Sequence, residues 1–206
     1  MELHLKSTYG FNNFRNNQKN IITDLLNNEN VFAILPTGGG KSLLYQFPAT
    51  YTKKITIVIS PLISLMNDQC KYLNSKNIPS VCLNSETCID ISEYTNYTII
   101  YTTPEFITLR INIFKNIINK ICLFAVDEAH CVSQWSHDFR ESYQQLAILK
   151  TTYPNTPLLA VTATATPHVI KEMYEYLNIY ECNEYILGTR RNNLEIKVLP
   201  KNKFIE

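Results

Sequence analysis

Several features are scarce or absent in this 206-residue chain, and each absence excludes classes of protein to which it could belong. Its net charge is only +1, so any surface that binds nucleic acid must be local rather than spread over the whole molecule. No apolar run approaches the length of a membrane span, and residues 1–10 are too polar for a signal peptide. The sequence therefore predicts neither secretion nor a transmembrane segment.

The cysteines occur without a pairing pattern. They are Cys70, Cys82, Cys88, Cys122, Cys131 and Cys182. No two of them form a C-x-x-C motif, which argues against a zinc site and against a disulfide framework. Most stand beside apolar residues, where a reduced thiol packs as a small hydrophobe. We therefore expect an intracellular protein of a reducing compartment, the nucleus or the cytoplasm, with no zinc site in this chain.

Glycine is also scarce, yet three of the five glycines are consecutive. Gly38–Gly40 follow the apolar run Val31–Leu35 and precede Lys41 and Ser42, where a helical pattern begins. Such a loop can cradle phosphates, because glycines let the backbone N–H groups turn inward and the helix N-terminus adds partial positive charge. Lys41 would reach the β- and γ-phosphates, and Ser42 would hold Mg²⁺. The full P-loop pattern has a glycine where Leu35 stands, so a glycine turn before a surface lysine is the alternative.

A second signature begins where the apolar run Ile121–Val126 ends in Asp127 and Glu128. Ligands gather at the carboxyl ends of strands in open α/β sheets, so both carboxylates are expected beside the glycine loop. Asp127 would hold Mg²⁺ opposite Ser42, and Glu128 would orient and deprotonate the attacking water. An acidic turn that caps the next helix is the alternative for this signature by itself. Together the two signatures predict machinery for nucleotide hydrolysis.

Short apolar segments alternate with helix-length segments along the chain. The predicted strands are 31–35, 55–60, 80–83, 97–102, 121–127 and 158–162. The predicted helices are 18–28, one that opens at 41, one that 61–65 lead into and that reaches about 75, 105–119, 143–151 and 167–177. This alternation predicts a three-layer α/β/α fold with a mostly parallel central sheet. Pro48 is expected to kink or end the helix that opens at Lys41.

One domain is expected to account for most of the chain, over residues 1–195. The segment after Gly188, TRRNNLEIKV, is interpreted as a last strand or as the exit from this domain. Residues 196–206 are interpreted as an exit strand or linker.

The stretch AVDEAHCVSQWSHDFR, residues 125–140, resembles the Walker B motif and aromatic-rich loop of RecQ-type DNA helicases of superfamily 2. Other segments resemble further motifs of that family in the same order: YGFNNFRNNQ, LPTGGGKSLLYQ, VISPLISLMNDQ, YTTPE and AVTATAT. The resemblance implies a RecA-like P-loop domain, the N-terminal ATP-binding lobe of an ATP-dependent helicase. The complete motor would move 3′ to 5′ on single-stranded DNA and unwind duplex DNA.

The resemblance also implies roles for individual residues. The nucleotide-binding residues are Phe11, Arg15, Gln18, Thr37, Gly38, Gly39, Gly40, Lys41 and Ser42. The catalytic residues are Lys41, Asp127 and Glu128, and the Mg²⁺ ligands are Ser42 and Asp127. The DNA-binding residues are Trp135, Phe139, Arg140, Ser60 and Thr102. The residues that couple hydrolysis to DNA are His130, Gln134, Thr162 and Thr164.

Several of these assignments have plainer alternatives. Trp135 could be a partly buried packing residue, and His130 could cap a helix. Thr162 and Thr164 could be ordinary threonines at the end of a strand. Phe14 is interpreted as a core aromatic rather than as a contact to adenine.

The partners implied are DNA and a second RecA-like lobe, whose motifs the chain does not contain; its end reads like a truncation. Arg140, Arg190 and Arg191 lie outside the motif that would aim an arginine at the γ-phosphate. Two other functions are kept open: an RNA helicase lobe of the DEAH group, and a non-catalytic ATP-binding half-motor.

Overall fold

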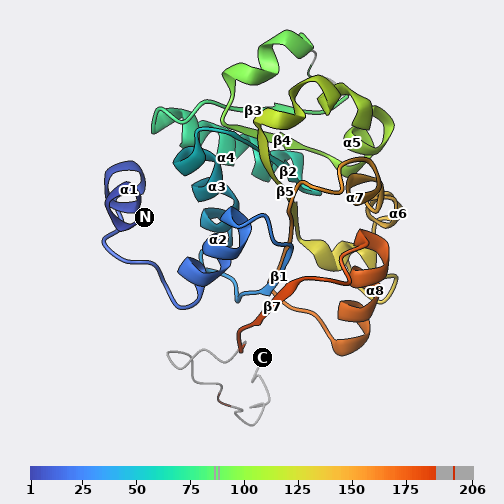
Figure 1. The fold of residues 1–206 in the computed structure, drawn as a ribbon. Coiled ribbons are helices and arrows are strands. Elements are labelled where there is room, and N and C mark those ends of the chain that lie inside the picture. The colour runs from blue at the N-terminus through green and yellow to red at the C-terminus, as the bar shows by residue number, and fades with distance from the viewer. Residues whose placement is uncertain (86, 88, 189–196, 198–206) are drawn as a thin grey trace, which may run out of the picture.

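The computed structural model describes residues 1–85, 87, 89–188 and 197, and these residues form an α/β/α sandwich (Figure 1). Within them, a sheet of seven strands runs in the order β3-β4-β2-β5-β6-β1-β7, and every pairing is parallel. The strands are β1 (Val31–Ile34), β2 (Ile55–Ile59), β3 (Ser80–Leu83), β4 (Ile99–Thr102), β5 (Ile121–Asp127), β6 (Leu158–Thr162) and β7 (Asn183–Ile186).

Helices cover both faces of this sheet (Figure 1). The α-helices are α1 (Glu2–Tyr9), α2 (Gln18–Leu26), α3 (Lys41–Thr52), α4 (Ile63–Ser75), α5 (Pro104–Arg110), α6 (Glu141–Gln144), α7 (Ile148–Thr152) and α8 (Pro167–Leu177). The 3₁₀ helices are η1 (Ile91–Asn96), η2 (Ile111–Lys120) and η3 (Ala129–Val132). No helix in the described ranges is long and apolar enough to cross a bilayer.

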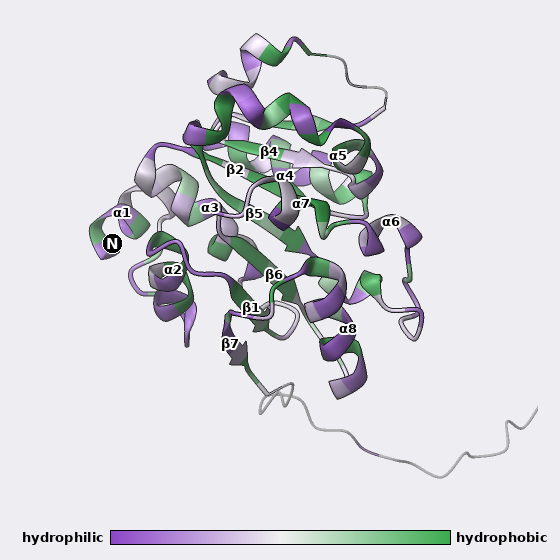
Figure 2. Ribbon diagram, turned by 45° about the vertical axis from the view of Figure 1, so that its right-hand side comes forward, coloured by the Kyte–Doolittle hydropathy of each residue, from purple (hydrophilic) through white to green (hydrophobic). Residues whose placement is uncertain are grey.

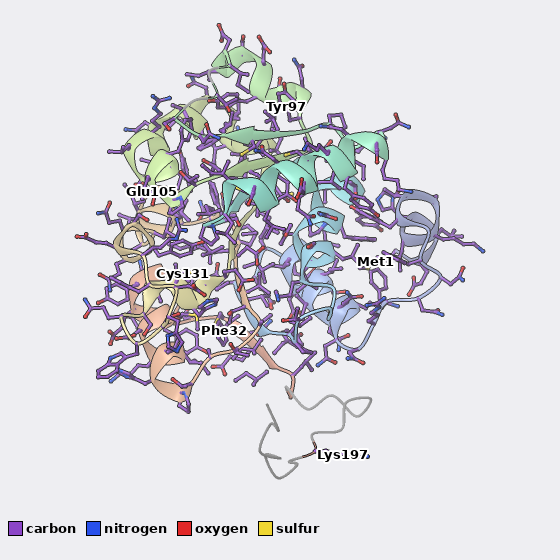
Figure 3. The ribbon with its side chains drawn as sticks, turned by 180° about the vertical axis from the view of Figure 1, so that it is seen from behind. Met1, Phe32, Tyr97, Glu105, Cys131 and Lys197 are labelled. Atoms are coloured by element: carbon purple, nitrogen blue, oxygen red, sulfur yellow. The ribbon has the colours of Figure 1, made fainter. Side chains whose placement is uncertain are left out.

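Two apolar cores flank the sheet, because successive side chains of a strand point to opposite faces. On β2, Ile57 belongs to the core beneath α5 to α8, whereas Val58 belongs to the core beneath α1 to α4. Buried side chains fill both layers (Figure 3), and in the hydropathy view the strands form a mostly apolar centre (Figure 2). Burial on both faces explains why the strands are continuous apolar runs and not alternating ones.

The predicted α/β/α fold is confirmed, and all six predicted strands are present. Pro48 was predicted to kink or end the helix that opens at Lys41; it does not end the helix, because α3 continues to Thr52. A proline inside a helix removes one backbone hydrogen bond. Residues Leu43–Ala49 are all buried, however, and tertiary packing of this kind outweighs local propensity.

Two predicted helices are each divided in the structure. The segment 105–119 forms α5 and then η2, and the segment 143–151 falls on α6 and α7. The buried residues of η2 are Ile111, Phe114 and Ile117, a spacing of three that suits a 3₁₀ helix with its three residues per turn.

Four elements were not predicted. They are α1, η1, η3 and the edge strand β7. Only Leu5 of α1 is buried, and β7 is largely exposed, so neither has the apolar pattern from which the other elements were identified. The strand predicted after Gly188, the arginines Arg190 and Arg191, and the linker 196–206 lie outside the described residues, with the exception of Lys197.

Candidate nucleotide-binding site and the adjoining aromatic loop

The loop between β1 and α3 has a backbone that glycine alone fits well. Gly38 and Gly40 have φ values of 80° and 81°, in the left-handed region. A Cβ on Gly39 would lie 2.7 Å from the Pro36 carbonyl oxygen. The loop ends at Gly40, which has no side chain to cap α3, so the first N–H groups of this 12-residue helix are available to an anion. The predicted phosphate cradle is therefore sterically sound.

The two sequence signatures meet at one cavity. Its volume is 160 Å³, and its lining includes Lys41 and Ser42 from α3 and Asp127 and Glu128 from the end of β5. The pair Lys41–Ser42 and the pair Asp127–Glu128 lie about 85 positions apart in the chain. They are brought together because β5 lies near β1 in the sheet, separated from it only by β6.

Asp127 is suited to hold a cation. Its side chain is 7% exposed, and it accepts hydrogen bonds from the Glu128 N–H at 3.0 Å and the Tyr45 hydroxyl at 3.4 Å. Burial, and after it the charge of Glu128, raise the pKa of Asp127 to about 6, against the opposing effects of the Glu128 N–H, Lys41 and Tyr45. A buried carboxylate with no salt bridge in the described part of the chain is a ligand that Mg²⁺ would stabilise.

Glu128 stands directly after the strand in a strained conformation. Its φ is 49°, which is uncommon for a residue with a Cβ and recurs at functional sites. Its carboxylate is partly exposed and lies 3.3 Å from His130 Nδ1. The Glu128 carboxylate therefore borders the cavity, and the Glu128 backbone turns the chain away from the sheet.

His130 is connected to two other predicted coupling residues, Thr162 and Thr164. Its Nδ1 lies 2.7 Å from the Thr162 hydroxyl, and that hydroxyl donates to the Thr164 carbonyl at 3.2 Å. Its Nε2 lies 3.7 Å from an Asp138 carboxylate oxygen in the aromatic-rich loop. Gln134 is exposed and has no hydrogen bond to this group among the described residues. The structure thus brings His130, Thr162 and Thr164 together and leaves Gln134 apart.

The predicted adenine-binding residues lie against the phosphate loop. The Arg15 guanidinium donates to the Gly38 carbonyl at 3.0 Å, and the Gln18 amide donates to the Gly40 carbonyl at 3.1 Å. Phe11 is 45% exposed, so its ring is available to a base. Phe14 instead packs edge-on against Phe47 in the core, with ring centroids 5.3 Å apart.

The aromatic-rich loop presents its tryptophan to solvent. Trp135 is 76% exposed, so it is not a buried packing residue. Its ring lies edge-on to that of His168, with ring centroids 5.8 Å apart. Phe139 is 36% exposed, and Arg140 is partly exposed beside it. The aromatic faces are thus open to a ligand.

Two residues predicted to contact DNA are inaccessible in this conformation. Thr102 has no exposed surface, and its hydroxyl donates to the Thr103 carbonyl. Ser60 is 2% exposed and faces the 160 Å³ cavity. Thr102 is the last residue of β4 and Ser60 directly follows β2, and the contact of both residues with DNA stays a prediction.

Sequence reasoning missed the tyrosines that support Asp127 from below. Tyr45 donates to its carboxylate, and Tyr143 donates to its backbone carbonyl at 2.9 Å. Tyr45 falls one helical turn after Lys41, a spacing that could have indicated it. Tyr143 lies in α6, sixteen residues after Asp127, and no sequence pattern connects the two.

A parallel sheet that carries a glycine loop before one helix and an Asp-Glu pair at a nearby strand end defines a P-loop nucleotide-binding domain. Comparison with family models makes the assignment more specific: the DEAD/DEAH box helicase model matches residues 15–173. This chain belongs to the DEAD/DEAH box helicase family.

Its similar proteins include DNA helicases. It is 41% identical to ATP-dependent DNA helicase Q-like 4B of Arabidopsis thaliana, over 100% of this chain and 19% of the relative. It is 38% identical to ATP-dependent DNA helicase RecQ of Haemophilus influenzae, over 98% of this chain and 34% of the relative. A protein of Acanthamoeba polyphaga mimivirus that is named as a putative ATP-dependent RNA helicase is 42% identical, over 97% of this chain and 38% of the relative. The chain thus spans well under half the length of these relatives.

Solved structures agree in fold. A hypothetical ATP-dependent RNA helicase from Sulfolobus tokodaii matches with a TM-score of 0.67 at 18% identity, over 91% of this chain and 57% of that chain. The DUF1998 helicase MrfA matches with a TM-score of 0.69 at 17% identity, over 88% of this chain and 31% of that chain.

Proposed function

We propose that this chain is the ATP-binding lobe of a RecQ-like, ATP-dependent DNA helicase that moves 3′ to 5′ on single-stranded DNA. The observation that carries the proposal is the single cavity lined by Lys41, Ser42, Asp127 and Glu128. The exposed Trp135 beside this site supports DNA as the substrate, because aromatic faces stack on unpaired bases.

Each residue of the site has a defined task in hydrolysis. Lys41 neutralises the β- and γ-phosphates, and the N–H groups at the start of α3 bind them. Ser42 and Asp127 would hold Mg²⁺, which neutralises charge that develops on the phosphate oxygens. Glu128 orients the attacking water and takes its proton.

The nucleotide's base is proposed to stack on the Phe11 ring and the Arg15 guanidinium, with the Gln18 amide at its edge. In the present conformation Arg15 and Gln18 donate instead to carbonyls of the phosphate loop. Thr37 and the three glycines complete the cradle.

The link to DNA is proposed to pass through His130. It lies 3.3 Å from the Glu128 carboxylate and 2.7 Å from the Thr162 hydroxyl, and it approaches Asp138 of the aromatic-rich loop. A base stacked on Trp135 would therefore act on Glu128 through two side chains, Asp138 and His130. A second RecA-like lobe would supply the arginine that stabilises the transition state.

An RNA helicase lobe is the second candidate, favoured by the name of the viral relative. The segments SPLISLM and SQWSHDFR favour the RecQ-like alternative, because they resemble that group specifically. Stimulation of the ATPase by single-stranded DNA but not by RNA of the same sequence would decide for DNA. The reverse preference would decide for RNA. Nucleotide binding without any turnover in a two-lobed protein would indicate a non-catalytic half-motor.

The central test separates binding from chemistry. In a protein that carries this lobe and its second lobe, Lys41→Ala should abolish tight binding of ATP and turnover together. Glu128→Gln should preserve binding and lower kcat by roughly 10²–10⁴-fold, because the phosphate cradle survives while the water loses its base. Near-normal kcat in Glu128→Gln would refute the role given to Glu128.

A further inference from the structure

The cavity beside Asp127 extends past the nucleotide-binding residues into the protein. Beyond them it is lined by the polar residues Tyr45 from α3, Ser60 from the end of β2, Gln69 from α4 and Tyr101 from β4, and by the apolar Leu65 and Met66 from α4. About 10–15 Å³ of cavity volume is enough for one water molecule, so 160 Å³ has room for several. Water in a cavity needs polar partners, and these four polar residues supply them.

Ser60 is the member of this lining that most requires a ligand. It is 2% exposed, and its Oγ has no hydrogen-bond partner among the described residues. Buried hydroxyls are nearly always satisfied, by protein or by ordered water. Because Ser60 lines the cavity, a water in the cavity would satisfy it.

Gln69 faces the same space from α4 with a fixed orientation. Its Oε1 accepts a hydrogen bond from Gln46 Nε2 at 3.2 Å, and Gln46 also donates to the Tyr101 hydroxyl at 3.4 Å. With its oxygen held in this way, the Gln69 amide N–H₂ group is left as a donor. Gln46, Tyr101 and Tyr45 are nearly fully buried, so the arrangement is rigid.

The contacts of Gln46 and Tyr101 continue through Tyr45 to Asp127. Tyr45 packs edge-on against Tyr101, with ring centroids 6.4 Å apart, and its hydroxyl donates to Asp127 Oδ2 at 3.4 Å. The carboxylate is thus bordered by protein donors below and by the cavity beside it.

We propose that the inner part of this cavity is a built hydration site, in which water bound by Ser60 Oγ and the Gln69 amide hydrogen-bonds to Asp127. This water would orient the carboxylate toward its cation, and Ser60 and Gln69 are positioning residues for that cation. The part of the proposal that concerns the cation rests on the proposed function, whereas the hydration site itself does not.

A high-resolution crystal structure of the 206-residue chain tests the hydration site directly. Ordered water should lie at about 2.7–3.2 Å from Ser60 Oγ, with a second contact to Gln69 or Asp127. A Ser60 hydroxyl that donates to a protein group, or a cavity closed by side chains, would overturn the proposal.

The positioning role is tested with Mn²⁺ as the probe, in the presence of ADP, by electron paramagnetic resonance. Ser60→Ala and Gln69→Ala should each weaken Mn²⁺ binding by about tenfold, a usual loss when the partners of a metal ligand are removed. ADP affinity measured in EDTA should stay unchanged. The matched controls are Ser75→Ala and Asn67→Ala, at exposed positions of α4, and they should bind Mn²⁺ as the parent does.

The outcomes separate the two proposals. If Ser60→Ala and Ser75→Ala bind Mn²⁺ equally well, Ser60 does not position the cation. If the parent chain binds neither ADP nor Mn²⁺, the proposed function fails and the cation role fails with it, while the crystal structure still decides on the hydration site.

Discussion

At the scale of single residues, the burial of Asp127 lowers the free energy of unfolding at neutral pH by a measurable amount. Burial is the main reason that the pKa of this carboxyl rises from 3.8 to about 6. The native state therefore binds a proton more tightly than the unfolded chain does. Between about pH 4 and pH 6 the native state holds more protons, so this residue makes stability fall as pH rises. The effect is at most about 3 kcal/mol, since one pKa unit corresponds to about 1.4 kcal/mol.

Asp127→Asn should remove this cost. In EDTA, the variant and the parent should have similar urea stabilities near pH 3.5, and the variant should be more stable by up to about 3 kcal/mol at pH 7.5. Because other carboxylates titrate in both proteins, the difference between variant and parent isolates residue 127. A difference that is constant with pH would show that Asp127 ionises normally in the folded chain.

Residues of the site differ in how far the sequence could reveal them. Lys41, Ser42, Asp127 and Glu128 were predicted because each follows an apolar strand with a recognisable motif, and the structure places them on one cavity. The inward orientation of Ser60 could not be predicted, because a strand-end serine can face either side.

At the scale of elements, the sequence predicts best what is buried on both faces. All six strands with continuous apolar runs were predicted, and helix 167–177 coincides with α8. The edge strand β7 was missed because it pairs only with β1 and has little apolar pattern. The course of α3 through Pro48 was missed because it depends on long-range packing.

The aromatic-rich loop is the element whose role is most open to test. In a two-lobed protein, Trp135→Ala should leave the basal ATPase nearly unchanged and remove most of its stimulation by single-stranded DNA. The reason is that Trp135 is 76% exposed, and the loop that carries it approaches Glu128 through Asp138 and His130. Each stacked base contributes about 1–3 kcal/mol, so DNA affinity should fall by roughly 5- to 150-fold.

The control for this variant is Tyr180→Ala, which removes another exposed aromatic ring, 69% exposed, at the start of the loop before β7. It should retain stimulation by DNA. If Trp135→Ala lowered basal and stimulated turnover equally, the tryptophan would be supporting the catalytic site and not sensing DNA.

At the scale of the whole molecule, the described residues bring the glycine loop, Lys41, Ser42, Asp127 and Glu128 together on one parallel sheet. The 206-residue chain should bind adenine nucleotide with Mg²⁺, and at a hundredfold excess over Kd the ligand should stabilise it by about 2.7 kcal/mol, visible as a raised unfolding temperature. Turnover should be very slow, because an arginine supplied across a cleft contributes roughly 10³–10⁵ in kcat. Strand separation should be undetectable.

The lobe's Lys41→Ala variant is the control, and it should show no thermal stabilisation by nucleotide. A turnover of about one per second by the chain alone, stimulated by single-stranded DNA and abolished in Lys41→Ala, would contradict the requirement for a second lobe.

The position of β1 in the sheet has a consequence for how the protein is made. Its neighbours, β6 and β7, are the last two strands in the described chain, so the strand that leads into the glycine loop is bordered only by late segments. At about 5–20 residues per second, a ribosome needs roughly ten to thirty seconds to proceed from Lys41 to Ile186. During that interval the nascent chain can pair β2, β4 and β5 but must hold β1 without either partner. The nucleotide site is therefore expected to mature only after β7 has been synthesised, and until then the apolar β1 is a segment that a chaperone could protect.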